Sequence, residues 1–163
     1  MRLLLIYLIF NTICISYTLS IKDKLPNITL KDQFNKYINI PKDTKILITT
    51  SNDFLCNQVI KFFRNQHKKF LTKNKIIYIN RLEYKINFIS HFLHIYKMKQ
   101  NKFSILNLDS TYKELFELKN NHITIYKLRK RVILDISYIK TYEELKMFFK
   151  KLKTNNKIQS KQI

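Results

Sequence analysis

The sequence has 163 residues, enough for one ordinary domain, and its 31 Lys+Arg against 11 Asp+Glu give a formal net charge of +20. It contains no Gly, no Ala and only 2 Cys, which excludes collagen-like, Gly-linker and disulfide-scaffold proteins. A hydrophobic content of 45%, with 12 Phe and 10 Tyr, can form a core and excludes wholesale disorder. Because Lys, Asn and Ile codons can be written with A and T alone, this composition is typical of an AT-rich genome.

The N-terminus predicts an export signal. A Met-Arg start precedes the apolar run Leu3–Phe10, which continues with one interruption to a length of roughly 13 residues. This length fits the hydrophobic region of a signal peptide and falls short of the ~20 residues that span a bilayer. We expect residues 1–20 to be a signal peptide cleaved after Ser20, with cleavage after Ser16 or an uncleaved N-terminal anchor as alternatives. The protein would be periplasmic or secreted, with Cys56 as its single cysteine and therefore no intramolecular disulfide.

The rest of the chain alternates between strand and helix patterns. No linker or repeat divides residues 21–153, so we expect one domain there, followed by a disordered Lys-rich tail over 154–163. Apolar and β-branched runs predict strands over 27–30, 37–40, 45–50, 76–79, 103–108, 122–128 and 132–139. Apolar residues at helical spacing predict helices over 53–71, over 82–96 and from a Thr141–Glu144 capping box onward. This order predicts an α/β fold with a mixed central sheet flanked by helices.

The entry to the domain, LPNITLKDQFNKYINI, carries a family resemblance. It is similar to the entry of peroxiredoxins and envelope thiol-disulfide proteins, where a hairpin with Pro, Leu, Asp and Gly-Lys precedes the first core strand. Pro26, Leu30, Asp32 and Lys36 fit this pattern, and Asn35 stands at the glycine. Asn is well suited to that place because it tolerates a positive φ. Together with the element order, the chain resembles a thioredoxin-like domain, which implies a thioredoxin-like sandwich with an N-terminal β-hairpin.

The resemblance also implies where the chemistry of the family would lie. It lies between the first core strand and the first core helix, as Cys-x-x-Cys or as a single peroxidatic cysteine. In this chain Cys56 corresponds to the second cysteine, and Asp53 stands where the nucleophile would be. The family also has a cis-proline at the start of the strand that faces the site, and residues 99–105, where we expect that strand, contain no proline. The sequence therefore predicts a retained fold without dithiol exchange.

Cys56 is the candidate catalytic residue, and two interpretations of it remain open. It is either a reactive thiol whose pKa is lowered by the helix N-terminus and nearby Lys and Arg, or an inert small hydrophobe on the apolar side of the helix. We expect Asp53 to be the N-cap of that helix. The sequence predicts no cofactor, since glycine-rich phosphate loops need glycine. It predicts no metal site, because His91 and His94 fall on the polar face of their helix without further ligands.

The basic charge is spread over the chain and forms no dense block. Lys outnumbers Arg 26 to 5, whereas Arg is the usual residue for recognising bases and phosphates. We therefore expect no specific nucleic-acid partner, and expect weak contact with anionic lipid headgroups. The sequence favours an exported, non-catalytic accessory or binding module of the cell envelope with an unidentified protein partner. Two alternatives are a one-Cys thiol oxidoreductase or peroxidase using Cys56, and a basic module that binds polyanions or anionic membranes.

Overall fold

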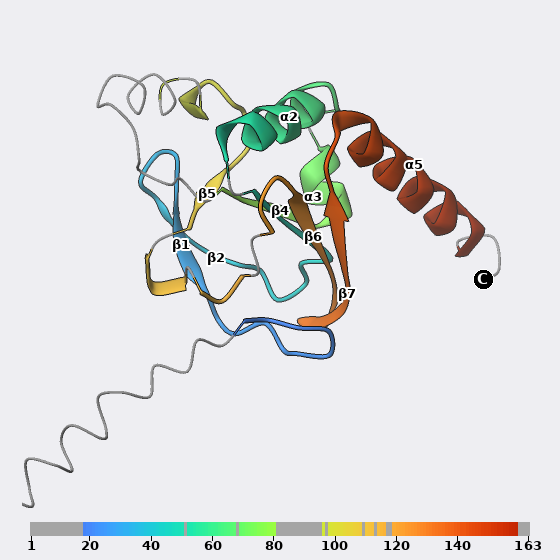
Figure 1. Ribbon diagram of the computed structural model, residues 1–163, viewed down its shortest axis with the longest axis horizontal. Coiled ribbons are helices and arrows are strands. Elements are labelled where there is room, and N and C mark those ends of the chain that lie inside the picture. The colour runs from blue at the N-terminus through green and yellow to red at the C-terminus, as the bar shows by residue number, and fades with distance from the viewer. Residues whose placement is uncertain are drawn as a thin grey trace, which may run out of the picture.

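The computed structural model describes residues 18–50, 52–67, 69–80, 96, 98–108, 110–112, 114–116 and 119–159. Within these ranges the chain forms a mixed seven-stranded sheet in the order β2-β1-β5-β4-β3-β6-β7 (Figure 1). The strands are β1 (Thr29–Asp32), β2 (Tyr37–Asn39), β3 (Ile46–Thr50), β4 (Ile76–Asn80), β5 (Leu106–Asn107), β6 (Ile123–Arg129) and β7 (Val132–Ile139). The helices are α2 (Asp53–Arg64), α3 (Phe70–Asn74), the 3₁₀ helix η1 (Ser110–Tyr112) and α5 (Tyr142–Gln159).

The strand directions confirm the predicted mixed sheet and the N-terminal hairpin. β3 runs parallel to β4 and β4 parallel to β5, whereas β1–β2, β1–β5, β3–β6 and β6–β7 are antiparallel. The β1–β2 turn is closed by Asp32, whose Oδ1 accepts hydrogen bonds from the backbone N–H groups of Phe34 (2.8 Å) and Lys36 (2.9 Å). Asn35 adopts the positive φ (62°) that the missing glycine would favour. The side chain of Asp32 thus extends β1 two residues beyond its predicted end at residue 30.

The sheet has a hydrophobic core on each face. Alternation along β3 places Ile46 and Ile48 on one face and Leu47 on the other, and all three are at most 3% exposed. The first face is covered by α2, α3 and α5, where Phe62 stacks on Phe149 with ring centroids 4.9 Å apart. Among the described residues, the second face is covered by the N-terminal segment, by Phe116 and by Tyr112 of the short helix η1. The predicted helix over 82–96 lies outside the described residues, apart from its last position.

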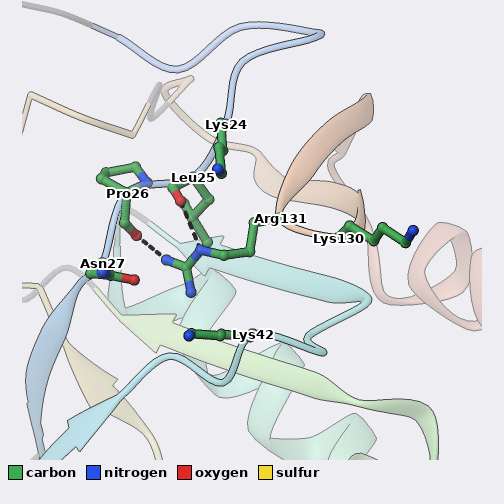
Figure 2. Close-up of a pocket in the computed structure, with 7 residues that line it drawn as sticks. All are labelled: Lys24, Leu25, Pro26, Asn27, Lys42, Lys130 and Arg131. Carbon is green, nitrogen blue, oxygen red and sulfur yellow. Dashed lines mark hydrogen bonds between the residues drawn. The ribbon is translucent and has the colours of Figure 1, made fainter.

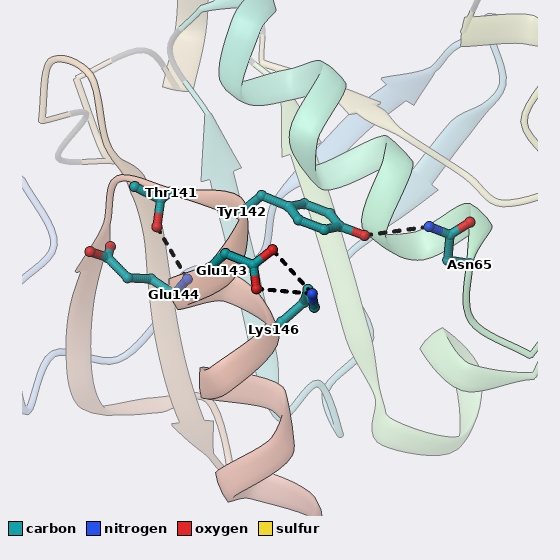
Figure 3. Close-up of polar contacts among 6 residues, drawn as sticks. All are labelled: Asn65, Thr141, Tyr142, Glu143, Glu144 and Lys146. Carbon is teal, nitrogen blue, oxygen red and sulfur yellow. Dashed lines mark hydrogen bonds and ion pairs between the residues drawn. The ribbon is translucent and has the colours of Figure 1, made fainter.

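Two helix boundaries differ from the prediction. The continuous helix expected over 53–71 is wrong: α2 ends at Arg64, and a separate α3 begins at Phe70. The last turn of α2 tightens, because the backbone N–H of Gln66 donates to the carbonyl of Phe63 at 3.1 Å, and the chain then turns Phe70 back toward the Phe62 ring. In contrast, α5 starts at its predicted cap, where the N–H of Glu144 donates to Thr141 Oγ1 at 3.2 Å (Figure 3).

Both ends of the domain differ from the expected boundaries. α5 extends to Gln159, into the range 154–163 that was expected to be a tail. At the other end, Leu19 is 1% exposed within the second core, and its N–H donates to the carbonyl of Leu115 at 2.9 Å. The packed structure therefore begins before Ser20, the expected end of the signal peptide. No helix among the described residues is long and apolar enough to cross a membrane.

Candidate functional site

The junction between β3 and α2 is where the resemblance places the chemistry of the family. Asn52, and not Asp53 as predicted, is the N-cap of α2: its backbone is extended, and its Oδ1 accepts the N–H of Leu55 at 2.9 Å. Asp53 is the first helical residue and is exposed. The preference for Asn52 has a simple cause, because an amide oxygen caps a helix as well as a carboxylate does, which leaves Asp53 to interact with the helix dipole.

Cys56 lies in the first turns of α2 and points into the core. Its side chain is fully buried among the residues that α2 packs against the sheet. This burial raises the pKa of the Cys56 thiol from 9.0 to about 12, a hydrogen bond with Tyr78 lowers it by less, and the negative charge of Asp53 raises it further. The thiol is therefore protonated at neutral pH and shielded from solvent. This geometry favours the inert interpretation of Cys56 over the reactive one.

A buried polar chain runs beneath Cys56. The Tyr78 hydroxyl lies 2.8 Å from Thr50 Oγ1, which donates to Asn80 Oδ1 at 2.9 Å. All three residues are at most 1% exposed. The Nδ2 atom of Asn80 has no partner among the described residues. The sequence did not predict this hydrogen-bonded chain of side chains, because Tyr78 lies in the apolar strand IIYIN, where an aromatic residue is expected to be part of the core.

The strand that faces the junction is β6, and the prediction that placed it at residues 99–105 is wrong. β3 pairs with β6, with Thr50 opposite Ile123, whereas β5 is separated from β3 by β4. The residues just before β6 approach the site, since Asn52 Nδ2 donates to Asn121 Oδ1 at 3.4 Å. No proline occurs in this segment either, and the described residues contain no cis peptide bond. Sequence spacing predicted both strands but could not tell which of them pairs with β3, because strand order depends on contacts far apart in the chain.

No cluster of three His, Cys, Asp or Glu side chains that could hold a metal is present among the described residues. His91 and His94 lie outside the described residues. Beside the junction, Phe54 projects from the start of α2 and is 70% exposed. The junction thus presents the exposed ring of Phe54, the carboxylate of Asp53 and the amides of Asn52 and Asn121, whereas the thiol of Cys56 is buried.

Comparison with known proteins bears on the fold. No protein-family model matches the sequence, and no curated protein matches it. Among solved structures, the chain is similar to a peroxiredoxin-like protein from Aquifex aeolicus (TM-score 0.53, 9% identity, 83% of this chain and 88% of that one). It is also similar to the thioredoxin domain of a thiol-disulfide oxidoreductase from Bacteroides vulgatus (TM-score 0.51, 11% identity, 80% and 98%). A yeast mitochondrial 1-Cys peroxiredoxin matches with a TM-score of 0.51 and 16% identity over 85% and 78% of the two chains.

These similarities confirm the thioredoxin-like fold that the element order predicted. At such identities they establish the fold alone, and the chemistry has to be argued from the residues of this chain.

Proposed function

We propose that this thioredoxin-like domain does not turn over thiols and disulfides and serves as a binding module of the cell envelope. The observation that carries the proposal is the placement of its only described thiol: Cys56 is fully buried, with a pKa raised to about 12. Dithiol exchange needs a thiolate that can reach the sulfur of its substrate. The exposed position one helical turn earlier holds Asp53, whose carboxylate cannot form a disulfide.

The surface around the junction supports a binding role. Phe54 offers a large exposed ring, and the amides of Asn52 and Asn121 lie beside the same helix start. An apolar anchor bordered by groups that donate and accept hydrogen bonds suits a protein partner, since aromatic residues with polar surroundings concentrate binding energy at interfaces.

Export is supported by the apolar N-terminal segment of the sequence. The contacts of Leu19 favour cleavage after Ser16 over cleavage after Ser20, because the later cut would remove a residue that is 1% exposed in the core. The mature domain would then begin at residue 17 and keep the hydrogen bond from Thr18 Oγ1 to the carbonyl of Glu114 (3.1 Å).

The test is a pair of turnover assays on the purified protein: reduction of insulin disulfides with a dithiol reductant, and consumption of hydrogen peroxide with a thiol donor. Each assay compares the wild-type protein with Cys56→Ser and includes an active thioredoxin or peroxiredoxin. We expect both forms of this protein to match the rate without protein. Turnover by the wild-type protein that Cys56→Ser abolishes would overturn the proposal in favour of a one-Cys enzyme.

A further inference from the structure

A pocket of about 590 Å³ opens at the β6–β7 turn, and we call it the basic pocket. It is lined by Lys24, Leu25, Pro26, Asn27, Lys42, Lys130 and Arg131 (Figure 2). Four of these seven residues are cationic and none is acidic. Across the whole chain Lys and Arg make up only 31 of 163 residues, so the pocket is enriched in positive charge even for this basic protein.

The basic pocket is distant from the β3–α2 junction. β3 and β6 run antiparallel, with Thr50 opposite Ile123 at one end and Ile46 opposite Lys127 at the other. The junction follows Thr50, whereas Arg131 lies beyond the Lys127 end. An inference about the pocket is therefore independent of whether Cys56 is reactive.

Arg131 is a buried cation, and no carboxylate of the described residues forms an ion pair with it. It is 8% exposed, and its guanidinium donates to the backbone carbonyls of Leu25 (Nε, 2.9 Å), Ile40 (Nη1, 3.2 Å) and Pro26 (Nη2). A guanidinium has five N–H donors, so these bonds leave two unused. Carbonyl dipoles reduce the cost of burying the cation but do not neutralise its charge.

The carboxylates closest in sequence to the lysines of the pocket have partners elsewhere. Asp23, next to Lys24, accepts hydrogen bonds from Ser20 N (2.7 Å) and Ser20 Oγ (2.8 Å). Asp43, next to Lys42, pairs with Lys75 at 2.7 Å. Within the described residues, no ion pair joins a cation of the pocket to an acid. The residues that line the pocket therefore carry positive charge and no negative charge.

The backbone holds these cations in place. Lys130 (φ 51°) and Arg131 (φ 69°) form the β6–β7 turn in the left-handed region, which costs roughly 1–2 kcal/mol for each residue other than glycine. The turn is fixed by the N–H of Leu25, which donates to the carbonyl of Arg131 at 2.8 Å. Lys42 sits in a second tight turn, closed from Thr44 N to the carbonyl of Pro41 at 3.1 Å. Two successive left-handed residues are the usual connection of a two-residue hairpin, so the β6–β7 turn fixes where the side chains of Lys130 and Arg131 begin.

We propose that the basic pocket binds the phosphate group of a small molecule or of a lipid headgroup. A phosphate offers several oxygens to the two unused guanidinium N–H groups and carries the charge that the pocket lacks. Lys42 extends beneath the guanidinium and Lys24 lies on its other side, whereas Lys130 points away (Figure 2). The volume exceeds that of a phosphate and leaves room for an organic part beside Leu25 and Pro26.

The test is isothermal titration of the purified protein with inorganic phosphate, pyrophosphate and glycerol 3-phosphate, together with flotation on phosphatidylcholine vesicles with and without phosphatidylglycerol. The test variant is the double substitution Lys24→Gln and Lys42→Gln. The matched control is Lys36→Gln with Lys140→Gln, which removes the same charge at exposed positions outside the pocket. Thermal unfolding followed by circular dichroism verifies that both variants are folded.

We expect saturable binding that the pocket variant weakens by about tenfold or more and the control by less than about twofold, because charge-assisted hydrogen bonds are lost only in the former. Binding of the soluble phosphates without binding to vesicles would identify a small molecule, and pocket-dependent flotation that requires phosphatidylglycerol would identify a headgroup. An equal loss in both variants would assign binding to the diffuse charge of the protein and overturn the proposal. Absence of saturable binding to every probe would overturn it as well.

Discussion

The hydroxyl of Tyr78 lies 2.8 Å from Thr50 Oγ1, and this buried pair closes the space beneath Cys56. The same contact joins β4 to β3 at the end of the sheet from which α2 departs. A polar chain in this place joins the two strands next to the β3–α2 junction. The thiol stays protonated because burial raises its pKa by more than the hydrogen bond with Tyr78 lowers it.

Removal of the Tyr78 hydroxyl should destabilise the fold. Tyr78→Phe leaves Thr50 Oγ1 with one partner fewer in a fully buried site, and we expect the free energy of unfolding to fall by about 1–3 kcal/mol. Urea unfolding measures this change. Tyr37→Phe is the control, because Tyr37 is 67% exposed and its change should stay within about 0.5 kcal/mol. Equal effects of the two substitutions would show that the buried hydrogen bond contributes nothing.

The raised pKa of Cys56 predicts a loss of stability at alkaline pH. In the folded protein the Cys56 thiol keeps its proton up to about pH 12, whereas in the unfolded chain the same thiol loses it near pH 9.0. Between these values the folded state binds more protons, so its stability is complete below pH 9 and falls as pH rises toward 12. The full shift corresponds to about 4 kcal/mol.

Cys56→Ala provides the matched comparison for this pH dependence. Urea unfolding from pH 8 to 10.5 should give a steeper decline for the wild-type protein than for Cys56→Ala. Tyr78 is present in both proteins; burial raises its pKa well above the ordinary value and Cys56 raises it further, so the difference between the two declines reports Cys56 together with its effect on Tyr78. Parallel declines would show that Cys56 is not desolvated in solution.

The contacts of Leu19 predict where the exported chain begins. Mass spectrometry of the mature protein should show that its first residue is residue 17. A chain that begins there keeps Leu19, whose side chain is 1% exposed in the core. A chain that begins at residue 21 should lose about 2 kcal/mol of unfolding free energy, since it lacks one fully buried leucine. A native N-terminus at residue 21, with stability equal to that of the longer chain, would contradict this prediction.

The parts of the fold that depend on residues close together in the chain could be predicted from the sequence. The β-branched run of β3, the capping box at Thr141 and the turn at Asn35 each specify their structure through neighbours in the chain. The choice of Asn52 over Asp53 as N-cap was not predictable, because both side chains cap helices well and are adjacent in sequence.

The features that failed prediction depend on residues far apart in the chain. β6, and not the segment at 99–105, faces the junction because of the strand order, which periodicity does not reveal. The basic pocket joins the segment 24–27 to the turns at Lys42 and at Lys130, and the bond from Arg131 Nε to the carbonyl of Leu25 alone links residues 106 positions apart. Residue types could indicate that Asp53 stands where the resemblance would place a nucleophile, and they left two interpretations of Cys56 open; the packing of α2 against the sheet favours the buried one.

The most direct test of the central claim is the rate at which iodoacetamide alkylates Cys56 in the native protein at pH 7.5. Cys14→Ser, which lies in the expected signal peptide, leaves Cys56 as the only thiol to be counted by mass spectrometry. The rise of the pKa from 9.0 to about 12 lowers the thiolate fraction about a thousandfold, and burial slows access further. We expect alkylation at least about a thousandfold slower than in guanidinium chloride, where the unfolded thiol is exposed. Native labelling at a rate close to that of the unfolded chain would contradict the buried, inert Cys56 and with it the proposal of a domain without thiol chemistry.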